Sequence, residues 1–179
     1  MTYPFEQAVS YTKGRGGKKP LQIFLHTMET PETKGRAKQV WQWFGGKTSP
    51  KASAHFMTDA TDVLQSVQTS DTAWAVDDFA LNQTSISIEM SGVASQTEAD
   101  WADAYSTAEL ALVAKLVAEL CKQFNIPIVK LSPADVAANK SGIGGHWDVT
   151  LGKKIAGGHT DPGKYFPWDK FIAQVKALS

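Results

Sequence analysis

Several common features are missing from this sequence, and each absence excludes a class of protein. The 179 residues include one cysteine, Cys121, so an intrachain disulfide is excluded. Cys121 falls on an apolar helical stripe, where we expect a buried thiol. The 18 basic and 18 acidic side chains give a formal net charge of zero, so electrostatics offer no case for nucleic acid as a partner.

Long apolar runs are also missing. No stretch approaches the length that crosses a bilayer, so we expect no membrane insertion. Residues 1–10 lack the charged-then-apolar pattern of a secretory signal, which predicts synthesis in the cytosol. Because repeats, low-complexity tracts and linkers are absent as well, we expect one domain over residues 1–179, with residues 1–19 as a polar N-terminal extension.

The N-terminal extension interleaves basic residues with glycines. Its cations are Lys13, Arg15, Lys18 and Lys19. The pattern is typical of a solvated loop, and a loop that contacts anions is the alternative. The glycine-to-Gly-Lys-Ser/Thr spacing of a phosphate-binding loop is absent.

The secondary-structure signals predict alternating strands and helices. Residues 85–90 alternate strictly between apolar and polar, with Ile86, Ile88 and Met90 on one face of a strand. Residues 106–125 carry a wide apolar helical stripe, with Ser106 and Glu109 in a capping-box pattern. Further predicted strands are 21–25, 52–58, 63–67, 72–76 and 126–131, and further predicted helices are 35–44, 132–139 and 167–178.

Histidines and an aspartate stand out among the polar residues. His26 ends the apolar run 21–25, where sheets commonly present functional groups. His146, His159 and Asp161 lie in a glycine-framed stretch near the end of the chain. A catalytic zinc needs three protein ligands and an open position, which His26, His146 and Asp161 could provide. The spacing alone also allows each histidine to be structural or exposed, since the helical His-Glu-x-x-His signature is absent.

A family resemblance favours the metal site. In order along the chain, five segments resemble the motifs of zinc-dependent N-acetylmuramoyl-L-alanine amidases, the type-2 amidases with the peptidoglycan-recognition-protein fold, and in particular the amidase domains of bacteriophage endolysins. The segments are Ile23-Phe24-Leu25-His26-Thr27, Ser53-Ala54-His55-Phe56, Ser85-Ile86-Ser87-Ile88-Glu89, Gly145-His146 and the run from Thr160 to Trp168. The last motif is the most specific.

The resemblance implies roles for individual residues. It implies that His26, His146 and Asp161 bind one zinc ion, and that Glu89 is the general base acting on the catalytic water. His159 stands where many members of the family carry a lysine that stabilises the oxyanion. A histidine can donate that hydrogen bond only in a suitable tautomer or when protonated, so this departure affects the pH dependence.

Three further assignments stay open at the level of sequence. The gap between His146 and Asp161 is longer than in the family, so His159 is a rival third ligand. Trp43 and Trp147 could stack on sugar or peptide, and structural packing is the alternative for both. His55 matches a strand position near the cleft, where packing is favoured over metal binding.

The complete prediction is an α/β fold: a central mixed sheet with helices on both faces and zinc in a groove at one side. The resemblance implies hydrolysis of the amide between N-acetylmuramic acid and L-alanine in peptidoglycan, and bacterial cell wall lysis as a phage endolysin. We expect a monomer that is made in the host cytoplasm and acts on the wall after release. The alternatives are a peptidoglycan-binding module without catalysis and a zinc peptidase that cuts within the stem peptide.

Overall fold

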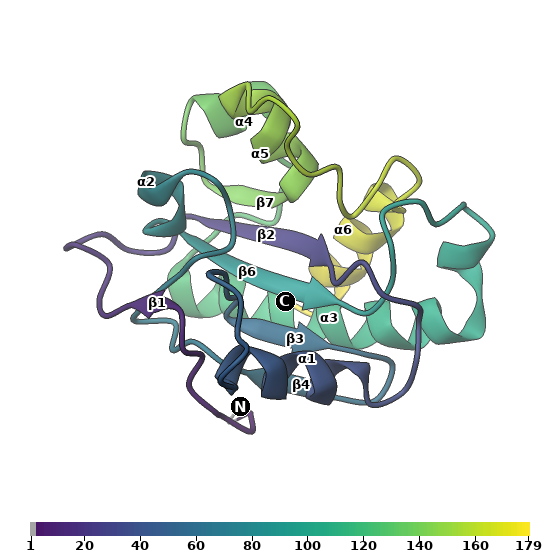
Figure 1. Ribbon diagram of the computed structural model, residues 1–179. Coiled ribbons are helices and arrows are strands. Elements are labelled where there is room, and N and C mark those ends of the chain that lie inside the picture. The colour runs from purple at the N-terminus through teal and green to yellow at the C-terminus, as the bar shows by residue number, and fades with distance from the viewer. Residues whose placement is uncertain (1–2) are drawn as a thin grey trace.

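The centre of the protein is a mixed five-stranded sheet. The computed structural model describes residues 3–179, and its sheet has the strand order β4-β3-β6-β2-β7 (Figure 1). Strands β3, β6, β2 and β7 run parallel, and β4 pairs with β3 in the antiparallel direction. The strands span Phe56–Thr58 (β3), Val63–Gln65 (β4), Ser85–Met90 (β6), Gln22–Thr27 (β2) and Gly142–Gly145 (β7). The predicted mixed sheet is therefore confirmed.

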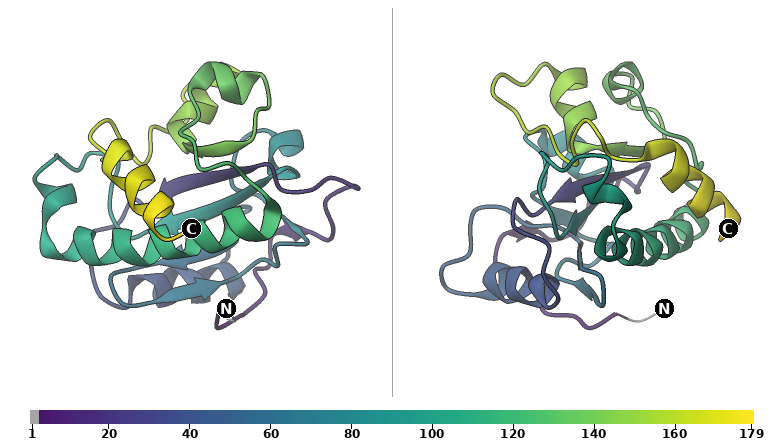
Figure 2. Two further views of the ribbon diagram at one scale, coloured as in Figure 1. Left: turned by 180° about the vertical axis from the view of Figure 1, so that it is seen from behind. Right: turned by 90° about the vertical axis from the view of Figure 1, so that its right-hand side faces the viewer.

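Helices cover both faces of this sheet. The long helix α3 (Ala104–Phe124) and the terminal helix α6 (Trp168–Ala177) lie together on one face (Figure 2). Helix α1 (Arg36–Gly45) packs against β3 and β4 from the other side. Alternation in β6 directs Ile86, Ile88 and Met90 into the core beneath α3, so Glu89 faces the α1 side.

The sheet edge at β7 carries two short helices, α4 (Pro133–Ala137) and α5 (His146–Lys153), which pack against each other. Ser132 caps α4, as its sequence predicts, in a capping box with Asp135. Helix α5 begins directly at the end of β7. The sequence reading missed both β7 and α5.

The N-terminal residues pack onto this body. Strand β1 (Tyr11–Thr12) pairs antiparallel with β5 (Thr72–Ala73), and a short helix α2 (Phe79–Asn82) follows β5. Arg15, predicted to be solvated, is buried, and its guanidinium donates to the carbonyl oxygens of Thr69, Gln83 and Ser85. The solvated-loop prediction is therefore wrong for Arg15, because backbone carbonyls replace water around its charge.

Two other local predictions need correction. Residues 126–131 do not form a strand; only Lys130 makes an isolated bridge, to Ile143 of β7. Helix α3 starts earlier than predicted: Asp103 is its N-cap, accepting from the Ser106 N–H. Glu109 is buried and accepts from the Ser91 N–H and the Thr58 hydroxyl instead of completing a capping box.

A 3₁₀ turn at Asp100–Ala102 precedes α3. Within residues 3–179, no helix combines the length and apolar character needed to cross a membrane.

Candidate metal and catalytic centre

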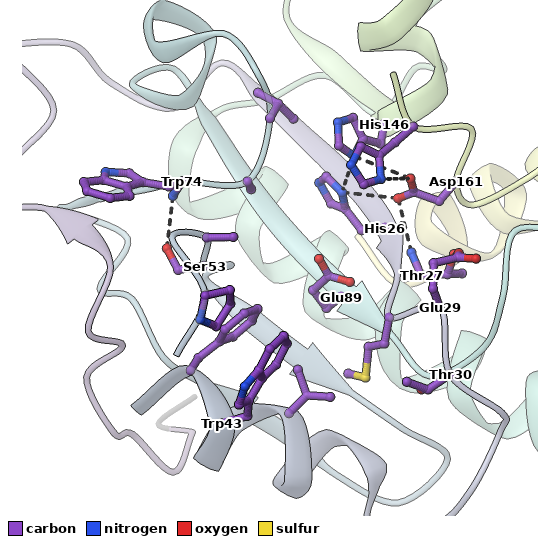
Figure 3. A pocket seen from close by; sticks show the side chains of 18 of the residues that line it. His26, Thr27, Glu29, Thr30, Trp43, Ser53, Trp74, Glu89, His146 and Asp161 are labelled. Carbon is purple, nitrogen blue, oxygen red and sulfur yellow. Dashed lines mark hydrogen bonds and ion pairs between the residues drawn. The ribbon is translucent and has the colours of Figure 1, made fainter. Parts of the chain in front are cut away.

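A cavity of about 650 Å³ opens on the α1 side of the sheet (Figure 3). Its lining includes His26, Glu89, His146, His159 and Asp161. All the residues that the sequence predicted to bind metal or to act in catalysis therefore line this cavity. Figure 3 shows His26, His146 and Asp161 together at one side of the cavity, Glu89 in its middle, and Trp43 and Trp74 at the other side.

The three predicted metal ligands meet although they are far apart in the sequence. Nδ1 of His26 lies 3.1 Å from Nδ1 of His146. The carboxylate of Asp161 lies 3.3 Å from His26 Nδ1 and 3.4 Å from His146 Nδ1. All three side chains are buried, and among residues 3–179 they are the one group of His, Cys, Asp and Glu side chains with donor atoms close enough to hold a metal ion.

Parallel strand pairing places two of these ligands. Leu25 is the last residue of β2 that pairs with β7, opposite Gly145, so His26 and His146 follow their partners at the same end of the two strands. Asp161 arrives from the segment after α5. It is fixed at two points, because its Oδ2 accepts from the Thr27 N–H at 3.3 Å and its carbonyl oxygen accepts from the Trp147 N–H at 2.9 Å.

The converging atoms of this cluster fit a cation. They are Nδ1 of His26, Nδ1 of His146 and the carboxylate oxygens of Asp161, which are ligand types of a catalytic zinc. Tetrahedral zinc with bonds of about 2.0–2.1 Å separates its ligand atoms by about 3.3 Å, which matches the observed 3.1–3.4 Å spacing. Nε2 of each histidine and Oδ1 of Asp161 are buried without a hydrogen-bond partner in the part of the chain that the structure describes.

Electrostatics in the cluster follow from burial and close contact. Burial lowers the pKa of His146 to about 3, and the neighbouring His26 acts in the same direction. Burial also acts to lower the pKa of His26, but the hydrogen bond to Asp161 and the charge of Glu89 outweigh it and raise that pKa. Burial would raise the pKa of Asp161, yet the contact with His26 holds it below its usual range. Asp161 is thus an anion, as a metal ligand must be.

Glu89 is the acid nearest to this cluster in the sheet. It pairs with His26 in the register of β6 and β2, so both side chains point to the same face. One side of Glu89 is open to the cavity. Burial of the rest of the side chain raises its pKa to about 7, with Asp161 and Glu29 adding to the shift and His26 opposing it. A carboxylate with such a pKa can accept and release a proton near neutral pH.

His159 lies at the rim of the cluster. Its ring stacks on His146 with centroids 4.5 Å apart and an interplanar angle of 10°. Its Nδ1 is 3.7 Å from Asp161 Oδ1, and its side chain is 61% exposed. Thr150 holds the segment in place by donating its hydroxyl hydrogen to the His159 carbonyl oxygen. The structure therefore places His159 outside the three-ligand group and open to the cavity.

Comparison with known families agrees with this geometry. Residues 16–164 match the family model described as N-acetylmuramoyl-L-alanine amidase. The chain belongs to the N-acetylmuramoyl-L-alanine amidase family. It is accordingly an enzyme, and the activity of the family is hydrolysis of an amide of peptidoglycan. No curated protein sequence matches this amidase.

Solved structures share its fold. The structure of PlyL superposes with a TM-score of 0.65 at 18% sequence identity, covering 100% of this chain and 99% of PlyL. A mutant endolysin from Bacillus subtilis gives a TM-score of 0.65 at 19% identity, covering 98% and 99% of the two chains. A selenomethionine derivative of AmpD gives 0.66 at 18% identity, covering 96% and 93%. The type-2 amidase fold predicted from the sequence is confirmed.

The tryptophans of this amidase differ in position. Trp41 packs against the core, and its indole N–H donates to the Gln65 carbonyl oxygen. Trp43 is 47% exposed and lines the cavity, as the sequence reading allowed. Trp147 is not among the lining residues, and its backbone N–H donates to the Asp161 carbonyl oxygen.

Trp74 lines the cavity as well, and the sequence reading missed it. It is 37% exposed, and the hydroxyl of Thr12 accepts from its indole N–H at 2.9 Å. Trp43 is held in a similar way, since its indole N–H donates to the Thr48 carbonyl oxygen. The predicted strand 72–76 contains Trp74 but does not indicate a role for its side chain, which reaches the cavity only in the tertiary structure.

His55 is buried away from the metal cluster. Its Nδ1 accepts from the Ser87 N–H, and its Nε2 lies 2.8 Å from the guanidinium of Arg15. Burial lowers the pKa of His55 to about 3, and the charge of Arg15 adds to this effect. The expectation that His55 packs instead of binding metal agrees with this placement.

Proposed function

We propose that this amidase is zinc-dependent and cleaves the amide between the lactyl group of N-acetylmuramic acid and the L-alanine of the stem peptide. One observation carries the proposal: three buried side chains that can bind a metal converge beside a carboxyl group, Glu89, in a single cavity. His26, His146 and Asp161 would hold the ion. Bound there, zinc lowers the pKa of a water molecule to roughly 7 and polarises the carbonyl of the substrate.

Glu89 is the general base in this proposal. Its carboxylate takes a proton from the attacking water and returns it to the leaving amine of L-alanine, so that the stem peptide departs neutral. The pKa of about 7 supports both transfers, because proton donation and acceptance are then nearly balanced at neutral pH. The position of Glu89 beside His26 in the sheet keeps the base within the same cavity as the reacting carbonyl.

His159 stabilises the oxyanion in this proposal. Its ring is exposed to the cavity and is oriented by stacking on His146. A ring N–H can donate a hydrogen bond to the oxygen that becomes negative as water adds to the carbonyl. Trp43, on the opposite side of the cavity, provides an exposed apolar surface for a sugar ring or peptide segment.

The biological setting that fits this activity is lysis of the bacterial wall as a phage endolysin, made in the host cytoplasm. Support comes from the fold, which is shared over nearly the whole chain with a Bacillus subtilis endolysin. A monomer suffices for the reaction, since all the proposed residues come from one chain.

The decisive experiment digests purified muropeptides and identifies the products by mass spectrometry. The proposal expects an intact stem peptide with a new free N-terminal alanine, loss of the reaction after chelation, and its return with zinc. Cleavage inside the stem would instead indicate a peptidase. Binding without any product would indicate a recognition module, and full cleavage after exhaustive zinc removal would exclude the mechanism.

A further inference from the structure

The first turn of α5 is held by a carboxylate that the proposed reaction does not use. Gly145 ends β7, and His146 is the first residue of the helix. Asp148 Oδ2 accepts from the Gly145 N–H at 2.7 Å. This contact satisfies one of the free N–H groups at a helix start and places a negative charge where the helix dipole favours it. Asp148 therefore fixes the backbone immediately before a proposed metal ligand.

Lys130 binds the same oxygen. Its Nζ lies 2.6 Å from Asp148 Oδ2 and 4.4 Å from the centroid of the Trp168 ring. The side chains of Lys130 and Asp148 are only 28% and 15% exposed, so solvent screens this pair less than an ion pair on the open surface. Lys130 is itself anchored by its bridge to Ile143 of β7.

The same turn also reaches Asp161. The Trp147 N–H donates to the Asp161 carbonyl oxygen at 2.9 Å. Gly145 packs so closely that a Cβ atom there would lie 2.5 Å from Pro162 Cδ and 3.2 Å from the Asp161 carbonyl oxygen. Residues 145–147 thus set the backbone positions of two of the three proposed ligands at once.

We infer that Asp148 and Lys130 are positioning residues that preset His146 and Asp161 for the metal. This inference rests on the proposed zinc site. Without the Asp148 carboxylate, the Gly145 N–H loses its charged hydrogen-bond acceptor. Residues 145–147, which position His146 and contact Asp161, then become less well ordered. Zinc then has to order the ligands as it binds, so its affinity falls. In the metal-loaded enzyme we expect kcat to fall and KM to stay nearly constant, because neither residue lines the cavity.

The neighbouring helix provides a matched control. Asp135 accepts from the Ser132 N–H at the start of α4 and forms an ion pair with Lys140 at 2.7 Å. Asp135→Asn removes a cap charge and an ion pair of the same kind without touching a ligand. Asp148→Asn and Lys130→Met are the test variants, and Lys130→Arg, which keeps the charge, should restore part of the loss.

The measurements are the zinc dissociation constant, by competition with a chromogenic chelator, and the visible absorption spectrum after cobalt replaces zinc. We expect Asp148→Asn to weaken zinc binding about tenfold or more and to alter the cobalt spectrum. Lys130→Met should act in the same direction, and Asp135→Asn should leave both readouts unchanged. Thermal melting of the metal-free variants checks that each one folds.

Equal zinc affinity in Asp148→Asn and Asp135→Asn would overturn the inference. If Asp148→Asn fails to fold, an unchanged zinc affinity and cobalt spectrum in Lys130→Met would also overturn the inference. Failure of the proposed function is a distinguishable result, because the unaltered protein would then bind no zinc.

Discussion

Two buried histidines flank strand β6 from opposite sides, and their surroundings differ in kind. His55 precedes β3 and contacts Ser87, while His26 is the next-to-last residue of β2 and pairs with Glu89, two residues beyond Ser87 in β6. Around His55 the protein supplies two donors, a backbone N–H and the guanidinium of Arg15, together with the Asp71 carbonyl oxygen 3.3 Å from Nε2. Around His26 it supplies further acceptors, the Nδ1 of His146 and the carboxylate of Asp161.

The contrast shows that burial does not distinguish a functional histidine from a structural one. The chemical types of the neighbouring groups make that distinction. His55 faces the guanidinium of Arg15, which lies where a metal ion would otherwise bind, whereas His26 and His146 face each other and a carboxylate, the ligand types of a catalytic zinc. The two sites therefore predict different responses to metal removal and to substitution.

Removal of zinc should have the largest effect. Chelation should abolish amide cleavage, because the ion proposed to bind His26, His146 and Asp161 supplies the activated water, and stoichiometric zinc should restore it. The measurement is muropeptide turnover alongside metal content by atomic absorption. The Arg15→Met variant, which alters the His55 site, should lose activity on chelation and regain it with zinc just as the unaltered enzyme does. Loss of bound zinc in Arg15→Met before chelation would contradict the distinction between the two histidine sites.

Glu89→Gln should come next. We expect retention of zinc with a loss of kcat of roughly 10²- to 10⁴-fold, since the amide cannot accept a proton. Steady-state kinetics and metal analysis on one preparation check this result. Turnover equal to that of the unaltered enzyme would remove Glu89 from the mechanism.

His159→Ala should have a smaller effect and leave zinc bound. Loss of one oxyanion donor costs on the order of 10²-fold in kcat, and less where the donor is exposed to water. Metal content separates the two roles of His159 considered from the sequence: loss of zinc together with activity would make it a ligand.

Arg15→Met should reduce stability and spare catalysis. The substitution leaves the carbonyl oxygens of Thr69, Gln83 and Ser85 without their buried donor, which costs roughly 3 kcal/mol in the free energy of unfolding. Urea unfolding measures this loss. Turnover per folded molecule, with zinc present, should stay within about twofold of the unaltered enzyme.

Acid should reveal His55 in the metal-free protein. Its pKa is about 3 in the folded state, against about 6.5 when unfolded, so the unfolded state binds the proton more readily. Stability from this group is complete above pH 6.5 and falls by about 1.4 kcal/mol per pH unit as the pH drops toward 3. His146, whose pKa is also lowered to about 3, adds to the slope of the metal-free protein. His55→Asn, whose amide oxygen can replace Nδ1 as an acceptor, should therefore show a shallower slope in urea unfolding that still differs from zero.

Where side-chain alternation or a helical stripe was strong, the sequence predicted the structure well. Residues 85–90 form β6 as expected. Their alternation is regular because one face of the strand packs in the core and the other faces the side of the sheet with the cavity. Strand β7 was missed, because the residues Gly-Ile-Gly-Gly contain no alternation. Glycine is required there: a Cβ at Gly142 would lie 2.8 Å from the Leu131 side chain and 2.9 Å from the Val129 carbonyl oxygen.

The ligand set was predicted from family motifs, and its convergence could not have been derived from spacing. Arg15 was misread because a basic residue between glycines resembles a solvated loop, and its carbonyl partners lie 54–70 residues away. Trp74 lies in a predicted strand, 72–76, but nothing in the sequence indicated that its side chain lines the cavity. Both errors concern contacts that form only after distant segments pack together.

The separation of the ligands along the chain bears on the order of folding. His26 and His146 are 120 residues apart, and they lie side by side because β2 pairs directly with β7. Closing so long a loop is entropically costly, so the ion cannot organise an early nucleus in the way that it does in a small zinc finger. Tight zinc binding would therefore mark the completion of the sheet, and it would serve as a sensitive assay for a fully folded chain.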